Sequence, residues 1–92
     1  MSFDITNYYE PLVVAAIKRY ATEHLTDSHD HDLLEDAACM ALNRLPARYI
    51  RHYIDVSFFL STNERSRMEE QVDHAVKQAF DYLLNEPDLQ RK

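Results

Sequence analysis

The sequence predicts a small, mainly α-helical domain of three to four helices with one short extended segment. Apolar residues recur at intervals of three and four along most of the chain, as one face of a helix requires. Glycine is absent from all 92 residues, so turns that need a positive φ are avoided or use Asn or Asp. The pattern changes to alternation between residues 49 and 60. We expect one domain over residues 1–92, with its core over 5–84 and a tail over 86–92.

The first helix is expected over residues 8–25. Asn7 and Glu10 have the spacing of a capping box, and Pro11 lies in the first turns, where a missing N–H group costs least. The face that follows this cap consists of residues three and four apart, namely Tyr9, Val13, Ala16, Ile17, Tyr20 and His24. We expect this face to be buried.

The second helix is expected over residues 31–45, because Pro46 ends its pattern. Its helical spacing is set by Leu34, Ala37, Ala38, Ala41 and Leu45, and its other faces carry Leu33, Cys39, Met40 and Leu42. One neighbour cannot cover so much apolar surface, so this helix is central or lies at a subunit interface. Cys39 is expected on a buried face, where a thiol is inert.

The segment 49–60 alternates between an apolar and a polar set. Its even positions are Ile50, Ile54, Val56, Phe58 and Leu60, and its odd positions are Tyr49, Arg51, Tyr53, Asp55 and Ser57. We interpret it as extended, with a helix from about residue 54 as the alternative. A strand needs a partner, and the only other candidate is the same segment of a second subunit. The small size of the chain also favours an oligomer, and we expect a homodimer through this segment or the second helix.

The third helix is expected over residues 62–85. Ser61 and Glu64 form a second capping box, and Pro87 closes the pattern. A long apolar stripe follows the cap and consists of Met68, Val72, Ala75, Val76, Ala79, Phe80 and Leu83. This helix has the strongest pattern in the chain.

Positive charge is concentrated in one part of an acidic chain. The net charge is −6, but residues 44–67 hold five arginines against Asp55 and Glu64, which makes this part +3 and the remainder −9. An acidic protein is poorly suited to binding duplex DNA through many phosphates, so we expect no direct DNA binding. Without glycine, phosphate-binding glycine loops are excluded. A small anionic ligand fits the local charge better.

No apolar run approaches the roughly 20 residues that a membrane span needs, so no membrane association is expected. The first residues, MSFDITNYYE, lack the basic region and apolar core of a signal peptide, so we expect a cytoplasmic protein.

Metal binding and catalysis have weak signals. His29 and His31, within the run DSHDHD, could ligate a transition metal, but such acidic runs more often form solvated loops that precede a helix. A single cysteine cannot build a Cys-rich zinc site. The carboxylates have no distinctive partner in the sequence, so the residues leave an enzyme open without supporting one, and we expect no cofactor.

The arginine and aromatic residues have a chemistry suited to a nucleotide. Arginine can grip phosphate or the N7/O6 edge of guanine with two donors, and tyrosine can stack on a base. If the segment is extended, Tyr49, Arg51, Tyr53 and Asp55 share one face. Thr62 and Arg65 share a face at the start of the third helix, where an anion is favoured. On this chemistry alone, we favour a structural explanation over a nucleotide site, namely a surface ion pair between an arginine and an aspartate beside aromatic residues of the core.

Three stretches resemble the late competence development ComFB family: NYYEPLV, DLLEDAACMALNRLPARYI and HYIDVSFFLSTNER. The resemblance covers about residues 5–84 and is most specific at ALNRLPARY. It implies a small regulatory protein that is not an enzyme. Some members of the family that this sequence resembles are associated with competence. Others are receptors for cyclic dinucleotides, chiefly cyclic di-GMP.

The resemblance also implies site residues. Receptor members carry a basic residue three before an aspartate and a threonine three before an arginine. Thr62 and Arg65 match the second pattern, while the first is matched by His52 before Asp55, or by Arg51 one residue out of step. By resemblance Arg51 and Arg65 engage phosphate or guanine, Asp55 the guanine amino edge, Thr62 a phosphate, and His52 makes a supporting contact. Other members have cysteines that can hold zinc in the loop before the second helix. The corresponding loop here, LTDSHDHD, has no cysteine, so the resemblance does not imply a structural zinc.

The leading functional hypothesis is therefore a non-catalytic cyclic di-GMP receptor that signals through an unidentified protein partner. The alternative is a competence-related protein-interaction module that binds no nucleotide.

Overall fold

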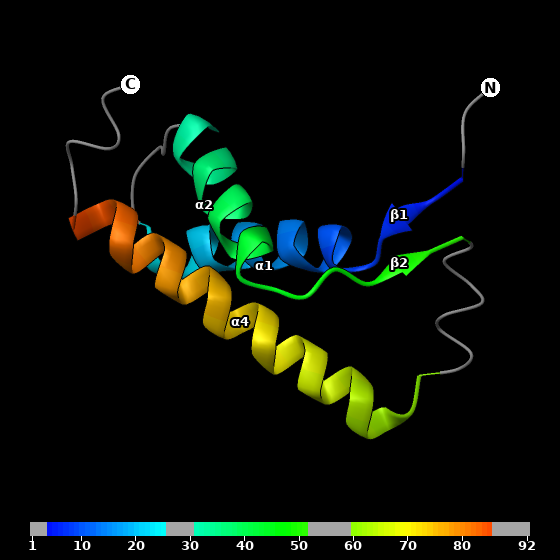
Figure 1. The fold of residues 1–92 in the computed structure, drawn as a ribbon. Coiled ribbons are helices and arrows are strands. Elements are labelled where there is room, and N and C mark those ends of the chain that lie inside the picture. Colours follow the sequence, from blue (N-terminus) through cyan, green and yellow to red (C-terminus); the bar gives the residue numbers. More distant parts are fainter. Residues whose placement is uncertain (1–3, 26–30, 52–59, 86–92) are drawn as a thin grey trace.

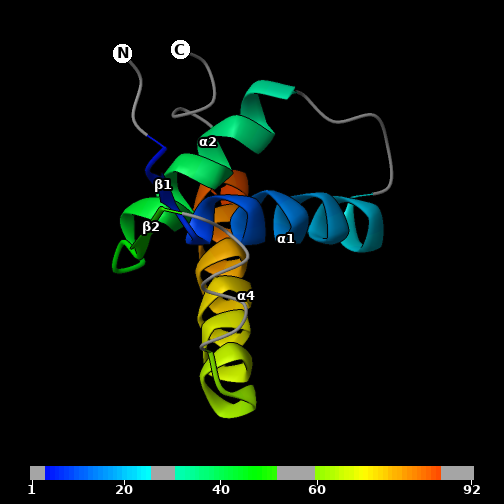
Figure 2. The same cartoon turned by 90° about the vertical axis from the view of Figure 1, so that its right-hand side faces the viewer.

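The computed structural model describes residues 4–25, 31–51 and 60–85. Along the chain the elements are β1 (Thr6–Asn7), α1 (Tyr9–His24), α2 (His31–Asn43), β2 (Tyr49–Ile50) and α4 (Thr62–Asn85). The long helix α4 packs against both α1 and α2, which also pack against each other (Figure 1). Figure 2 shows α4 running across the direction of α1. The prediction of a mainly α-helical domain is confirmed.

The two short strands form an antiparallel pair, with Thr6 opposite Ile50 and Asn7 opposite Tyr49. The expectation that β2 could find a partner only in a second subunit was therefore wrong. The backbone N–H of Tyr8 donates to the carbonyl oxygen of Arg48 at 2.6 Å, which continues the pairing beyond the strands. The sequence did not predict β1 as the partner strand, because a strand of two residues is too short to show an alternating pattern. Continuation of the extended segment, and the alternative helix from residue 54, fall on 52–59, outside the described residues.

Helix α1 begins one residue later than expected and ends at His24. The N-cap residue of α1 is Tyr8, which makes no side-chain capping bond, so the capping box expected from Asn7 and Glu10 was wrong. Asn7 Oδ1 instead accepts the N–H of Tyr9 at 3.2 Å. The predicted face is largely correct, because α1 buries Tyr9, Val13, Ala16, Ile17 and Ala21. Tyr20 is half-buried, whereas His24 is exposed and lies against the Tyr20 ring, with 4.4 Å between the ring centroids.

Helix α2 buries a narrow stripe of Leu33, Ala37 and Ala41. Cys39 is exposed, so the expectation of a buried thiol was wrong. At about 100° per residue, Cys39 lies about 200° from both Ala37 and Ala41, on the opposite side of the helix. The remaining apolar side chains flank the stripe and are half-buried against the core: Leu34, Ala38, Met40, Leu42 and, beyond the helix, Leu45. The central position expected for this helix agrees with its contacts to α1 and α4.

Helix α4 has the bounds that the sequence predicted. Its capping box is reciprocal, because Glu64 N–H donates to Ser61 Oγ at 3.1 Å and Ser61 N–H donates to Glu64 Oε1 at 3.3 Å. Every residue of the predicted apolar stripe is buried. The ring of Phe80 stacks on Tyr20 of α1, with 4.6 Å between centroids and 5° between planes.

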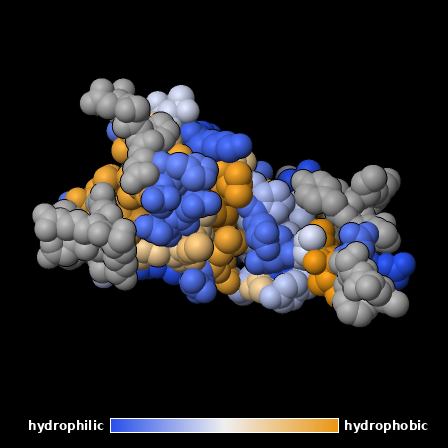
Figure 3. Space-filling model, turned by 90° about the horizontal axis from the view of Figure 1, so that it is seen from above, coloured by the Kyte–Doolittle hydropathy of each residue, from blue (hydrophilic) through white to orange (hydrophobic). Residues whose placement is uncertain are grey.

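The surface also carries apolar side chains. Seen from above, hydrophobic atoms gather on the half of the molecule that holds α2, and a smaller hydrophobic patch lies toward the β1–β2 end (Figure 3). Within the described ranges no helix is both long and apolar enough to cross a membrane.

Candidate functional site

The predicted ligand residues lie on either side of residues 52–59. Arg51 directly follows β2, while Thr62 and Arg65 lie in the first two turns of α4. The end of β2 and the start of α4 lie at the same end of the molecule, on the right in Figure 1 and facing the viewer in Figure 2. His52 and Asp55 lie outside the described residues, so their contacts stay predictions.

The β2 side of this end presents polar and aromatic groups to solvent. Ile50 is 7% exposed and belongs to the core. Its neighbours Tyr49 and Arg51 are exposed, Tyr49 by 70%. These three residues follow the alternation predicted for the segment. The aromatic ring and the guanidinium that were expected to meet a nucleotide are thus on the solvent side.

The position of this strand is set by Asn7, a residue that sequence reasoning identified only as a helix cap. Its Oδ1 accepts two backbone N–H groups, from Tyr9 at 3.2 Å and from Arg48 at 2.9 Å. One side-chain oxygen thereby joins the start of α1 to the residue before β2. The backbone that carries Arg48, Tyr49 and Arg51 is held against the start of α1 as a result.

Tyr9 extends this link to α4. Its side chain is nearly buried, and its hydroxyl donates to Gln71 Oε1 at 2.9 Å. Burial raises the pKa of Tyr9 above its usual value of 10.0, and the nearby positive charge of Arg48 partly offsets that rise. Through Asn7 and Tyr9, the segment ending at Arg51 is connected to the third turn of α4, the helix that begins with Thr62.

The α4 side offers the positive end of a helix dipole together with a hydroxyl and a guanidinium. Thr62 and Arg65 are exposed. The capping box uses the amides of Ser61 and Glu64, and the Arg65 N–H makes the first helical bond, to Ser61 O at 3.0 Å. Within the described residues, the hydrogen bonds of this cap do not involve the amides of Thr62 and Asn63. However, the Glu64 carboxylate already brings a negative charge to this helix start, so an anion bound here has to compete with it.

The sequence matches the family model described as late competence development protein ComFB over residues 6–87, which is most of the chain. The chain belongs to the ComFB family. The match runs from β1 to the end of α4, so both sides of the candidate site lie within the ComFB domain. No curated protein matches the sequence.

The other two arginines of the basic segment make different contacts in this ComFB domain. Arg44 Nη1 donates to Gln78 Oε1 at 3.0 Å and joins the end of α2 to α4. Arg67 lines a shallow hollow of about 590 Å³ on α4, together with Glu70, Gln71, Asp73 and His74. The arginines behind the local charge of +3 are therefore spread over the surface, with Arg48 and Arg51 at the sheet end and Arg65 in the first turn of α4.

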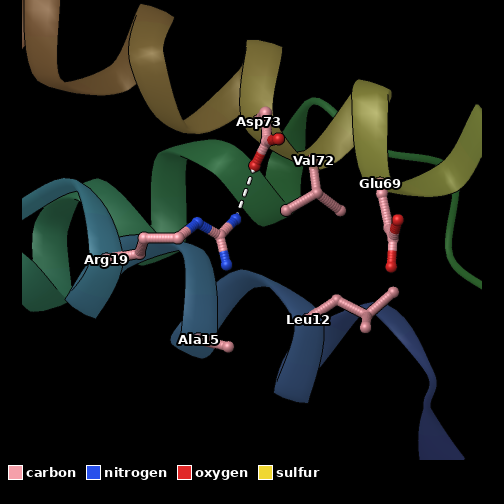
Figure 4. Close-up of a pocket in the computed structure, with 6 residues that line it drawn as sticks. All are labelled: Leu12, Ala15, Arg19, Glu69, Val72 and Asp73. Carbon is pink, nitrogen blue, oxygen red and sulfur yellow. Dashed lines mark hydrogen bonds and ion pairs between the residues drawn. The ribbon is translucent and has the colours of Figure 1, made fainter. Parts of the chain in front are cut away.

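A groove between α1 and α4 was not anticipated from the sequence. It has a volume of about 400 Å³ and is lined by Leu12, Ala15, Arg19, Glu69, Val72 and Asp73 (Figure 4). Arg19 Nη2 reaches across it to Asp73 Oδ1 at 2.8 Å. Both side chains are more than half exposed, so this ion pair contributes little stability. Of the predicted ligand residues, the three that the structure describes, Arg51, Thr62 and Arg65, do not line the groove.

The predicted metal-binding alternative gains no support from the described residues. His31 is the first residue of α2, and its Nε2 lies 3.5 Å from the Glu35 carboxylate. Across residues 4–25, 31–51 and 60–85, no group of three or more His, Cys, Asp or Glu side chains is placed to hold a metal ion. His29 lies outside these ranges.

Proposed function

We propose that this ComFB-family chain is a non-catalytic receptor for cyclic di-GMP that signals through a protein partner. The observation that carries the proposal is the exposure of Arg51, directly after β2, and of Thr62 and Arg65 in α4, since the end of β2 and the start of α4 lie at the same end of the molecule. A cyclic dinucleotide has two phosphates and two bases, so donors arranged on two elements suit it. The match of Thr62 and Arg65 to the receptor pattern of the resemblance adds support.

Each residue has a role in the proposal. Arg51 and Arg65 bind phosphate or the N7/O6 edge of guanine with paired N–H donors. Thr62 donates its hydroxyl to a phosphate near the positive end of the α4 dipole. In the intervening segment, Asp55 accepts hydrogen bonds from the guanine amino edge and His52 supports the phosphate. This role requires no cofactor and no chemical step.

The proposed receptor is a cytoplasmic homodimer. Its small size limits the surface that one copy can bury, which favours association. Two apolar side chains, one on α1 and one on α4, are about half exposed and would be covered in such a dimer: Val14 at 45% and Leu84 at 44%. Light scattering with and without cyclic di-GMP measures the oligomeric state, and a monomer under both conditions contradicts this part of the proposal.

A competence-related interaction module that binds no nucleotide is the second candidate. The same exposed apolar side chains on α1 and α4 favour it, because they could contact a protein partner. It predicts that the partner is captured equally well with and without cyclic di-GMP, and that Arg65 can be replaced without effect.

Titration calorimetry with cyclic di-GMP tests the receptor proposal directly. We expect binding at micromolar protein and ligand, and absence of heat from folded protein would overturn the proposal. Replacing Arg65 with Ala removes a charge-assisted hydrogen bond, typically worth about 1.5–3 kcal/mol, so affinity should fall by roughly 10-fold to 100-fold.

Arg19→Ala is the matched control for Arg65→Ala. It also removes an exposed arginine from a helix, but Arg19 pairs with Asp73 in the groove between α1 and α4. Its affinity for cyclic di-GMP should equal that of the unchanged protein. If Arg65→Ala binds as well as this control, Arg65 does not belong to the site.

A further inference from the structure

The two-stranded sheet has one face turned away from the core. Paired residues of antiparallel strands point to the same side, so Asn7 and Tyr49 share a face. Ile5 directly precedes β1 and Arg51 directly follows β2. If the alternation of the strands continues by one residue at these two positions, Ile5 and Arg51 lie on the same face as Asn7 and Tyr49. Ile50 points the other way, into the core.

This face carries the two most exposed large hydrophobic side chains of the described residues. Tyr49 is 70% exposed and Ile5 is 57% exposed. Figure 3 shows the small hydrophobic patch toward this end of the molecule. Neither side chain belongs to the core, and Arg51, which follows Ile50 in the sequence, is exposed as well. An exposed tyrosine ring and an exposed aliphatic side chain at the same end of the sheet as a positive charge suit a planar base that is attached to a phosphate.

We propose that Ile5 and Tyr49 form a platform on which one guanine base of the ligand stacks, with Arg51 at the edge of that base. The inference rests on the proposed receptor function and adds β1 to its site. Aromatic side chains bind bases through their π-face, and an adjacent arginine can pair with the N7/O6 edge of a guanine that lies on the ring. The platform supplies stacking, and Arg51 supplies selectivity for guanine.

The hydrogen bonds of Asn7 keep the platform in place before the ligand arrives. Asn7 Oδ1 holds Arg48 N–H at 2.9 Å and Tyr9 N–H at 3.2 Å, and Tyr8 N–H donates to Arg48 O at 2.6 Å. These bonds set the register of β1 against β2 and hence the position of Ile5 relative to Tyr49. A surface that is ordered in advance loses less conformational entropy on binding.

The test uses the full chain and calorimetric titration with cyclic di-GMP. Tyr49→Phe keeps the ring and should bind as the unchanged protein does. Tyr49→Leu keeps an apolar side chain but has no π-face, and Tyr49→Ala removes the platform, so both should bind roughly 5-fold to 100-fold more weakly, as expected for the loss of one base stack. Ile5→Ala should weaken binding by a smaller factor.

Tyr82→Ala is the control, because Tyr82 is also an exposed tyrosine but lies near the far end of α4. Its affinity should be unchanged, and thermal melting checks that every variant is folded.

Suppose that the unchanged protein binds cyclic di-GMP and that Tyr49→Leu and Tyr49→Ala bind it with the same affinity. This result overturns the platform but leaves the receptor function standing. If the unchanged protein does not bind, the receptor function and the platform both fail. If Tyr49→Ala loses capture of a protein partner but keeps cyclic di-GMP affinity, the face is a protein contact and the platform is overturned.

Discussion

At the scale of single residues, Tyr9 is where burial, hydrogen bonding and charge act on one group. Its side chain is only 4% exposed, and its hydroxyl reaches Gln71 of α4. Burial disfavours the phenolate and raises the pKa, and Arg48 favours the phenolate to a smaller extent. The neutral phenol is therefore the form that the folded protein prefers.

This preference predicts a loss of stability in alkaline solution. Because the pKa of Tyr9 is higher in the folded state, its contribution is fully present below pH 10.0, the unfolded value, and is lost as pH rises through the folded pKa. Urea unfolding at about pH 8 and about pH 11 measures the change. Tyr9→Phe cannot ionise, so its free energy of unfolding should decrease less between these two pH values than that of the unchanged protein.

The control for Tyr9→Phe is Tyr82→Phe. The Tyr82 side chain is 44% exposed, and this variant should show the full alkaline decrease of the unchanged protein. An equally large decrease in Tyr9→Phe would contradict the assignment of this effect to Tyr9.

At the scale of elements, the start of α4 combines a stable cap with a charge that opposes the proposed ligand. Ser61 and Glu64 satisfy each other's N–H groups, which fixes where the helix begins. The Glu64 carboxylate also complements the helix dipole. The same charge lies between Thr62 and Arg65 in the sequence, where the receptor proposal places a phosphate.

Glu64→Gln separates these two effects. A glutamine can accept the Ser61 N–H as the carboxylate does, so the cap is kept while the negative charge is removed. We expect the affinity for cyclic di-GMP to rise by roughly 2-fold to 5-fold at low salt, which is the usual effect of one charge near a helix terminus. This gain in affinity should shrink as salt is added, because salt screens exposed charges. Calorimetry at two salt concentrations measures both.

Glu23→Gln is the companion variant, since Glu23 is an exposed acid near the far end of α1. Its affinity should stay close to that of the unchanged protein. If Glu64→Gln binds cyclic di-GMP no better than Glu23→Gln does, the phosphate does not lie at the start of α4.

At the scale of the whole molecule, three helices share one core that is centred on α4. Phe80, Val13 and Val76 are the largest fully buried side chains, and Phe80 stacks on Tyr20 of α1. Helix α2 closes the core with the small residues Ala37 and Ala41, both fully buried. Because no helix has an apolar core of its own, we expect α1, α2 and α4 to unfold together.

Phe80→Ala should therefore lower the free energy of unfolding by about 3–5 kcal/mol, a large share of the roughly 5–15 kcal/mol that holds a small domain together. Far-ultraviolet and near-ultraviolet circular dichroism should report a single transition with a lower midpoint. Tyr82→Ala, two residues along the same helix but half exposed, should change stability much less. Equal losses in the two variants would place Phe80 outside the core.

Part of the fold could be predicted because the signals are local. A capping box spans four residues and a helical face repeats within four, so α4 and its whole apolar stripe were recognisable from the sequence. Cys39 was misplaced because α2 has apolar residues on several faces, and only packing decides which of them is buried. Arg51, Thr62 and Arg65 are exposed, and the ligand roles of these three residues stay predictions, as do those of His52 and Asp55.

By itself the sequence determined the helices, the buried faces of α1 and α4, the cap of α4 and the resemblance to the ComFB family. Only the tertiary structure decided that β2 pairs with β1 of the same chain, that Asn7 holds Arg48 in place, and that Arg19 meets Asp73 across a groove. The physical reason is distance along the chain. The Asn7–Arg48 and Arg19–Asp73 contacts join residues 41 and 54 positions apart, and such contacts form only when the helices have packed.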